Sequence, residues 1–126
     1  MRSSNAGKEA LLKAYTENVE AYQLYLKARF YYNTYTPDGT MKAIEYLREA
    51  ITIDPNYAMA YSGLSFCYIT LWYCKWLSME KYLLQRFVAA YQQALSMDDD
   101  LAESHPAGGR VLLHDEKHIV EATIAK

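Results

Sequence analysis

The sequence predicts an all-α fold. Ala43, Leu47 and Ala50 recur at the spacing of one helix face, and charged residues occupy the opposite face. Pro55 ends this pattern, because proline lacks an amide hydrogen and disfavours helical geometry in the residue before it. Apolar residues resume at Tyr57 with helical spacing, so a second helix is expected to fold back on the first. The 126 residues are 52% hydrophobic and 22% charged, which is typical of a folded domain and not of a disordered chain.

The first full helix is expected from Tyr22 to about Tyr35. Cap-type side chains at residues 16–18 precede it and mark the expected start of helical structure. Residues 1–17 are interpreted as a leader, and residues 18–126 as one helical domain.

A turn of residues 36–40 is expected between the first helix and a second helix over residues 41–53. Within this turn, Pro37 fixes one backbone dihedral angle and Gly39 permits a positive φ. The threonine at either end of the turn can cap the second helix, because its hydroxyl oxygen can accept from a free backbone amide.

The third helix is expected over about residues 57–76 and the fourth over about residues 79–97, with Ser78 as the cap of the fourth. A further helix is expected to begin near Leu101. It should be weak, because each glycine of the pair at 108–109 costs about 1 kcal/mol of helix stability relative to alanine.

A set of residues on both sides of Asp54-Pro55 has the types and the spacing of a helical repeat. Its members are Ala43, Leu47, Pro55, Tyr61, Leu64, Ser65 and Tyr68. The set resembles the junction between two tetratricopeptide repeats. The resemblance implies a right-handed α-α solenoid of about two and a half helix pairs, with repeats over about residues 18–55 and 56–99 and an incomplete repeat over 100–126.

The turns inside these repeats are longer than usual. Ala28 and Ser65, which hold equivalent positions, are 37 residues apart, against about 34 in a standard repeat. A similar elongated pattern occurs in tetratricopeptide segments of bacterial multidomain regulators, such as adenylate cyclases, serine/threonine kinases and winged-helix transcription regulators. The resemblance therefore implies a bacterial regulatory protein that acts as a scaffold.

The resemblance also implies a concave groove, lined by the first helices of successive repeats, that binds a peptide or a partner helix. Tyrosine, methionine and arginine, which anchor many protein interfaces, are frequent among the groove positions. The alternative is that several of these aromatic side chains pack against neighbouring helices. The lysine and asparagine set by which some relatives hold a C-terminal carboxylate is not reproduced, which argues against that ligand. The groove positions are Tyr22, Tyr25, Arg29, Tyr32, Met59, Ser62, Phe66, Ile69 and Arg110.

Self-association is a second hypothesis for the function. The sequence ends at Lys126, before a complete partner helix could close the third repeat. The last apolar face of a solenoid needs a cover, which residues 119–124 or another copy of the chain could supply. A homodimer that joins two copies of a larger regulator is therefore the alternative to partner binding.

Two histidines near the end of the sequence raise a third hypothesis, metal binding. His114 and His118 are four residues apart and would share a helix face, with Glu121 or His105 as a further ligand. The spacing is not that of the zinc-protease motif, in which glutamate follows the first histidine. A solvated turn is the interpretation that a polar tail favours, so we expect no metal and no cofactor.

No pattern in the sequence indicates an enzyme. The glycines at 108–109 lack both the spacing and the preceding strand of a phosphate-binding loop. The histidines all lie after residue 104, and both cysteines lie on an apolar helix. The net charge of −2, with both signs interspersed, also argues against a nucleic-acid partner.

The sequence favours a cytoplasmic protein. Cys67 and Cys74 would lie about 10 Å apart on one helix, too far for a disulfide, which suits a reducing compartment. No apolar run of signal-peptide length follows Met1. The uncharged stretch over residues 55–74 is long enough for a bilayer, but its polar residues and tyrosines fit a repeat helix better than a membrane span.

Overall fold

The computed structural model describes residues 16–97, which form four helices and no strand. Helix accounts for 79% of these residues, so the predicted all-α class is confirmed for this part of the chain. The third predicted repeat, over residues 100–126, lies outside the described residues. The helices are α2 (Val19–Tyr32), α3 (Pro37–Ile53), α4 (Ala58–Tyr73) and α5 (Glu80–Met97).

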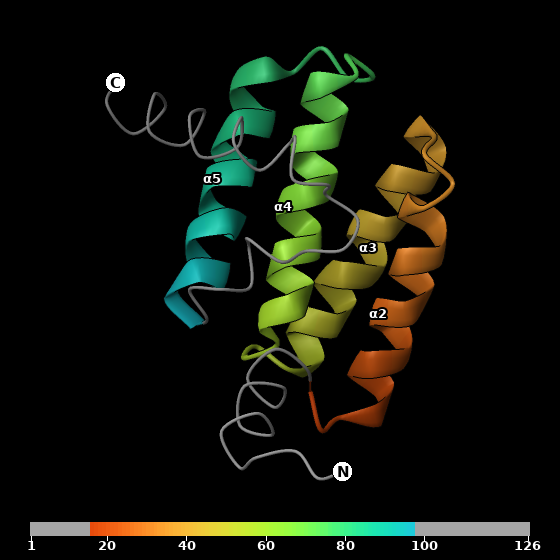
Figure 1. The fold of residues 1–126 in the computed structure, drawn as a ribbon, viewed down its shortest axis with the longest axis vertical. Helices are drawn as coiled ribbons and strands as arrows, with labels where there is room; N and C mark the ends of the chain where they lie inside the picture. Colours follow the sequence, from red (N-terminus) through yellow and green to blue (C-terminus); the bar gives the residue numbers. More distant parts are fainter. Residues whose placement is uncertain (1–15, 98–126) are drawn as a thin grey trace, which may run out of the picture.

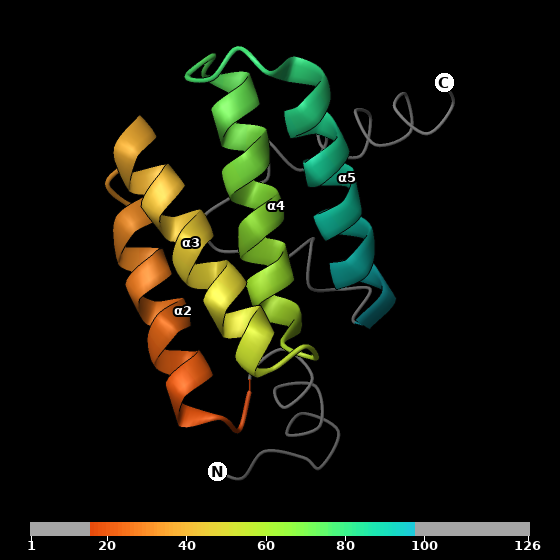
Figure 2. The same ribbon diagram turned by 180° about the vertical axis from the view of Figure 1, so that it is seen from behind.

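The helices are arranged as two packed pairs. The first pair is α2 with α3 and the second is α4 with α5, and α3 also packs against α4. Helices α2 and α5 lie at opposite edges with α4 between them, and both views of the ribbon agree on this order (Figures 1 and 2). The two pairs are therefore joined mainly through the contact between α3 and α4, with a smaller contact between α2 and α4.

Helix α4 lies at the centre of the core. Thirteen of its 16 residues are buried, including polar Ser62, Ser65 and Thr70. The hydroxyls of Ser65 and Thr70 donate to backbone carbonyls of the same helix, at 2.7 Å in both cases. These bonds satisfy the hydroxyl donors, so polar residues are compatible with burial on every side of the helix.

Helix α2 begins earlier than the sequence indicated. The Asn18 side chain accepts from the Ala21 amide at 2.9 Å, which confirms a cap among residues 16–18 and places the first helical residue at Val19. The helix also ends earlier than expected, at Tyr32. Tyr35 follows with a left-handed φ of 54°. A residue at this φ cannot continue an α-helix, so the expected extension to Tyr35 is wrong.

Helix α3 also begins earlier than expected, at Pro37 and not at Met41. The Thr36 hydroxyl oxygen accepts from the Gly39 amide at 3.0 Å, and proline is tolerated in the first turn because its missing amide hydrogen has no helical partner there. Gly39 is therefore helical, and the expectation that it supplies a positive φ is wrong.

The absence of a side chain at Gly39 is needed for a different reason. A Cβ atom at this position would lie 2.6 Å from the Tyr31 carbonyl oxygen and 2.8 Å from the Thr36 hydroxyl oxygen, and it would also touch the Thr34 hydroxyl oxygen. The end of α2 thus approaches the start of α3 as closely as glycine allows.

Helix α4 ends at Tyr73, before the expected boundary at Trp76. Lys75 has a left-handed φ of 57°, its amide donates to the Trp72 carbonyl at 3.1 Å, and the Trp76 amide donates to the Leu71 carbonyl at 3.1 Å. This pair of bonds is the Schellman ending of a helix, which usually has glycine at the left-handed position. Because lysine occupies that position here, the sequence carried no signal for the boundary.

Helix α5 begins at Glu80, and the Met79 carbonyl accepts from the Leu83 amide at 2.9 Å. The predicted cap at Ser78 is therefore one residue too early. The start of α5 is instead held by a side-chain contact, because the Trp72 indole donates to the Glu80 carboxylate at 2.9 Å.

The two turns that close the helix pairs touch each other. The Tyr35 hydroxyl lies 3.2 Å from the Cys74 sulfur, and the Tyr35 ring lies edge-on to Trp76 with a centroid distance of 5.2 Å. Cys74 and the fully buried Cys67 are both free thiols, as expected from their spacing. Within residues 16–97, no helix is sufficiently long and apolar to cross a membrane.

Replacement of Gly39 by alanine is expected to lower the free energy of unfolding by about 1–3 kcal/mol, because the new methyl group would overlap a backbone carbonyl. Gly63→Ala is the matched control: its Cβ would meet only the Leu47 side chain, at 3.2 and 3.3 Å, which can shift. Urea unfolding followed by circular dichroism measures both changes. Equal losses in the two variants would contradict the close approach at Gly39.

Candidate functional site

The structure describes eight of the nine positions predicted to line the groove. Arg110 lies outside the described residues, as do the candidate metal ligands His114 and His118. Tyr22 is exposed and Arg29 is half-buried on α2. The other six positions are buried, and they are Tyr25, Tyr32, Met59, Ser62, Phe66 and Ile69.

Several of the buried positions meet where α2 faces α4. The Tyr32 ring lies 5.4 Å from the Phe66 ring, and the Tyr25 ring lies 5.5 Å from the ring of Tyr57, which precedes α4. Such tilted aromatic pairs stabilise a packed interior. In this arrangement the side chains of Tyr25, Tyr32 and Phe66 take part in the contact between the two helix pairs.

Tyr32 in this aromatic contact is a neutral group. Burial raises the pKa of the Tyr32 hydroxyl above its ordinary value, and the neighbouring Tyr25 raises it further, while the positive charge of Arg29 acts in the opposite direction. Tyr32 therefore stays a neutral phenol at physiological pH. Its hydroxyl can take part in hydrogen bonds but does not supply a negative charge to the site.

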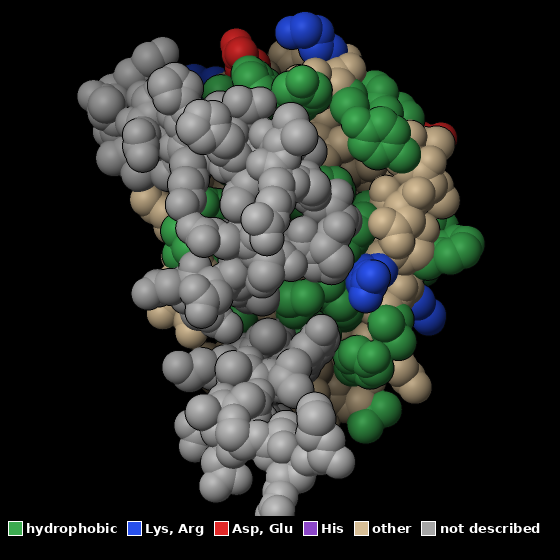
Figure 3. Space-filling model, viewed as in Figure 1, with side chains coloured by type: hydrophobic (Ala, Val, Ile, Leu, Met, Phe, Trp, Pro, Cys, Tyr) green, Lys and Arg blue, Asp and Glu red, His purple; other side chains and the backbone are tan. Residues whose placement is uncertain are grey.

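The outward face of α2 carries an apolar surface of which the sequence reasoning identified only Tyr22. Val19 and Phe30 are 70% and 67% exposed, and Tyr22 and Leu26 are also exposed. These four residues, named here the outer stripe, lie opposite the buried residues of the same helix, and hydrophobic side chains are visible along the α2 side of the molecule (Figure 3). A surface helix usually has a polar outward face, so the outer stripe is a candidate contact surface.

A signal for the outer stripe was present in the sequence. Helix α2 has apolar residues at helical spacing on two faces, one centred on Tyr25 and Ala28 and the other on Leu26 and Phe30. The spacing of apolar residues does not tell which of these two faces of α2 is buried, since both faces have the spacing of an amphipathic helix. Only the packing of α3 and α4 decides between them.

Aromatic and basic side chains fix the Phe30 end of the outer stripe. The Phe30 ring lies edge-on to Tyr31 at 5.3 Å, and Tyr31 stacks on Tyr46 of α3 at 5.7 Å. The Lys27 amine lies 5.7 Å from the centre of the Tyr46 ring, and the Lys42 amine lies 5.9 Å from the centre of the Tyr31 ring. Both distances suit cation–π attraction, so two positive charges are held beside this end of the stripe.

The opposite end of the outer stripe is acidic. Glu17 and Glu20 flank Val19 in the sequence, and both are exposed. The stripe therefore runs from an acidic end to a basic end along one apolar face. A ligand with a complementary order of charges would be favoured over one with the reverse order.

Over residues 16–97, no group of three or more His, Cys, Asp and Glu side chains is placed to hold a metal ion. Comparisons with protein-family models, with curated proteins and with solved structures found no match.

Tyr25→Ala is expected to lower the free energy of unfolding by about 3 kcal/mol or more, because Tyr25 is 1% exposed and packs against Tyr57. Tyr22→Ala, at a residue 40% exposed on the same helix, should change it by less than about 0.5 kcal/mol. Chemical unfolding of the two variants provides the comparison. Similar losses would show that Tyr25 does not belong to the core.

Proposed function

We propose that this protein is an interaction module that binds an amphipathic helix of a partner protein along the outer stripe of α2. The exposure of Val19, Tyr22, Leu26 and Phe30 on one helix face is the observation that carries this proposal. As part of it, the helix pairs are interpreted as tetratricopeptide-like units of a right-handed solenoid with a role in regulation.

The packing of helical repeats supports a helix as the ligand. In a stack of such units each helix pair is covered by its neighbour, and a terminal unit needs a polar outer face to remain in water. Helix α2 is the edge helix of the described part and has an apolar outer face. A partner helix laid against it would continue the helix-on-helix packing that joins α2, α3 and α4.

The charges beside the outer stripe select among helices. Acidic residues of the partner would lie near Lys27 and Lys42, and basic residues near Glu17 and Glu20. Such charge pairs at the rim of an interface contribute mainly to orientation and to the rate of association. The groove expected from the tetratricopeptide resemblance shares Tyr22 with the outer stripe, so a peptide ligand could contact both surfaces.

The order of charges also favours a second candidate function, self-association. Two copies packed antiparallel through the outer stripe would place the basic end of each α2 against the acidic end of the other. A twofold interface of this kind uses the same surface in both subunits. This dimer would serve the alternative role of joining two copies of a larger regulator.

Photo-crosslinking from the rim of the outer stripe tests these functions. A photoreactive amino acid at exposed Gln23 should form an adduct with a partner in an extract of the source cells. The double variant Leu26→Glu and Phe30→Glu should weaken the interaction at least about 100-fold, because two apolar side chains lose their burial. The matched control is Tyr73→Glu with Met79→Glu, which changes two apolar residues of similar exposure at the end of α4 and just before α5, and it should keep the adduct.

The mass of the adduct distinguishes the two functions. An adduct with a different protein, lost only in the stripe variant, supports partner binding. An adduct of two copies, with a dimer detected by light scattering, supports self-association. If no adduct forms, or if the stripe variant forms it as well as the control does, the outer stripe is not the binding surface.

A further inference from the structure

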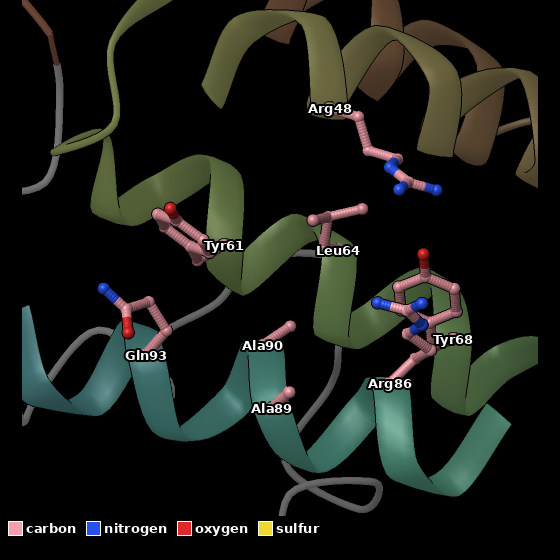
Figure 4. A pocket seen from close by; sticks show the side chains of 8 residues that line it. All are labelled: Arg48, Tyr61, Leu64, Tyr68, Arg86, Ala89, Ala90 and Gln93. Atoms are coloured by element: carbon pink, nitrogen blue, oxygen red, sulfur yellow. The ribbon is translucent and has the colours of Figure 1, made fainter. Parts of the chain in front are cut away.

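A hollow away from α2 is lined by residues of α3, α4 and α5. Its volume is about 360 Å³, which lies within the range of small-molecule sites. It lies between α3 and α5, with α4 as its floor (Figure 4). The lining residues are Arg48, Tyr61, Leu64, Tyr68, Arg86, Ala89, Ala90 and Gln93.

The hollow has a basic end and an apolar middle. Arg48 reaches from α3 toward the Tyr68 hydroxyl, and Arg86 reaches from α5 beside the same tyrosine (Figure 4). Leu64 and Ala90 separate this end from Tyr61 and Gln93. A ligand that fills the hollow would thus meet two guanidinium groups at one end and hydrocarbon next to them.

Both arginines are exposed, and the described residues offer them no carboxylate. Arg86 lies over the Tyr82 ring, 5.2 Å from its centre, and among residues 16–97 neither arginine is paired with an acidic side chain. The described lining contains no Asp or Glu. Two like charges beside one hollow repel each other, and an anion between them would relieve this repulsion.

Tyr68 adds a neutral hydrogen-bond donor to the basic end. Burial raises the pKa of its hydroxyl, while the positive charges of Arg48 and Arg86 act in the opposite direction. Both guanidinium groups lie on the side of the hollow where this hydroxyl is (Figure 4). The hydroxyl remains protonated at physiological pH and can donate to an anion between the arginines.

We propose that the hollow between α3 and α5 binds a phosphate monoester, with its phosphoryl group between Arg48 and Arg86 and its apolar part against Leu64 and Ala90. A phosphoryl group carries about two negative charges at pH 7, which matches two arginines better than the single charge of a carboxylate does. The planar guanidinium fork also suits two oxygens of one phosphoryl group. This site is separate from the outer stripe of α2.

An NMR titration of the full chain with phenyl phosphate tests this site. The backbone amide signals of Arg48, Tyr68, Arg86 and Gln93 should shift with one Kd, on the order of 1 mM for a ligand of this size. Phenylacetate, which has the same ring and one charge, and inorganic phosphate, which has no ring, should each bind more weakly. Equal binding of either probe, or no shift at a concentration about tenfold above the expected Kd, would overturn the proposal.

Matched substitutions locate the site. Arg48→Gln and Arg86→Gln should each raise the Kd about tenfold, because each removes a positive charge, and Tyr68→Phe should raise it about threefold, because it removes a hydrogen-bond donor. The controls Lys42→Gln and Lys81→Gln remove the same charge from exposed positions on the same two helices and should leave the Kd unchanged. Equal weakening in the controls would show a general attraction to positive charge and would contradict a built site.

The source of the monoester is distinguished by one further probe. A short phosphotyrosine peptide that binds more tightly than phenyl phosphate would support a phosphorylated protein as the source. Equal affinity of the two probes would support a free phosphate monoester. A peptide that fails to shift the Arg48 and Arg86 signals while phenyl phosphate does so would exclude the protein source.

Discussion

The burial of α4 on nearly every side is the constraint on which the rest of the structure depends. Helix α3 covers one side of α4 and α5 covers another, so both helix pairs bury their apolar faces against α4. A helix in this position can carry few charges, and α4 has none. In residues 16–97 the charged side chains therefore come from the other three helices and from the segments between and before the helices, and α4 supplies the floor of the hollow.

The sequence allowed the fold class and the approximate helices to be predicted, but not all of their ends. The cap at Asn18 and the break before Pro55 have local causes and were found. The ends of α2 and α4 were missed because Tyr35 and Lys75 adopt the left-handed conformation that usually belongs to glycine. Contacts between the turns hold these residues in place, and such contacts have no local sequence signal.

The candidate surfaces were less predictable than the fold, for a related reason. The tyrosines of α2 indicated recognition, yet a tyrosine that packs and a tyrosine that binds have the same spacing until the neighbouring helices are known. Arg48 and Arg86 are far apart in the sequence and belong to different helices. They come together only because both α3 and α5 pack on α4, so no motif could have paired them.

The contact of Tyr35 with Cys74 and Trp76 has a mechanical consequence. The two helix pairs are joined covalently at one end, through residues 54–57, and the contact between the turns braces them at the other end. Because the two helix pairs are in contact at both ends, they cannot separate by a hinge motion about one end. Motion between the pairs is then limited to small rotations of whole helices. The distance between α3 and α5, which a ligand in the hollow would bridge, stays nearly constant.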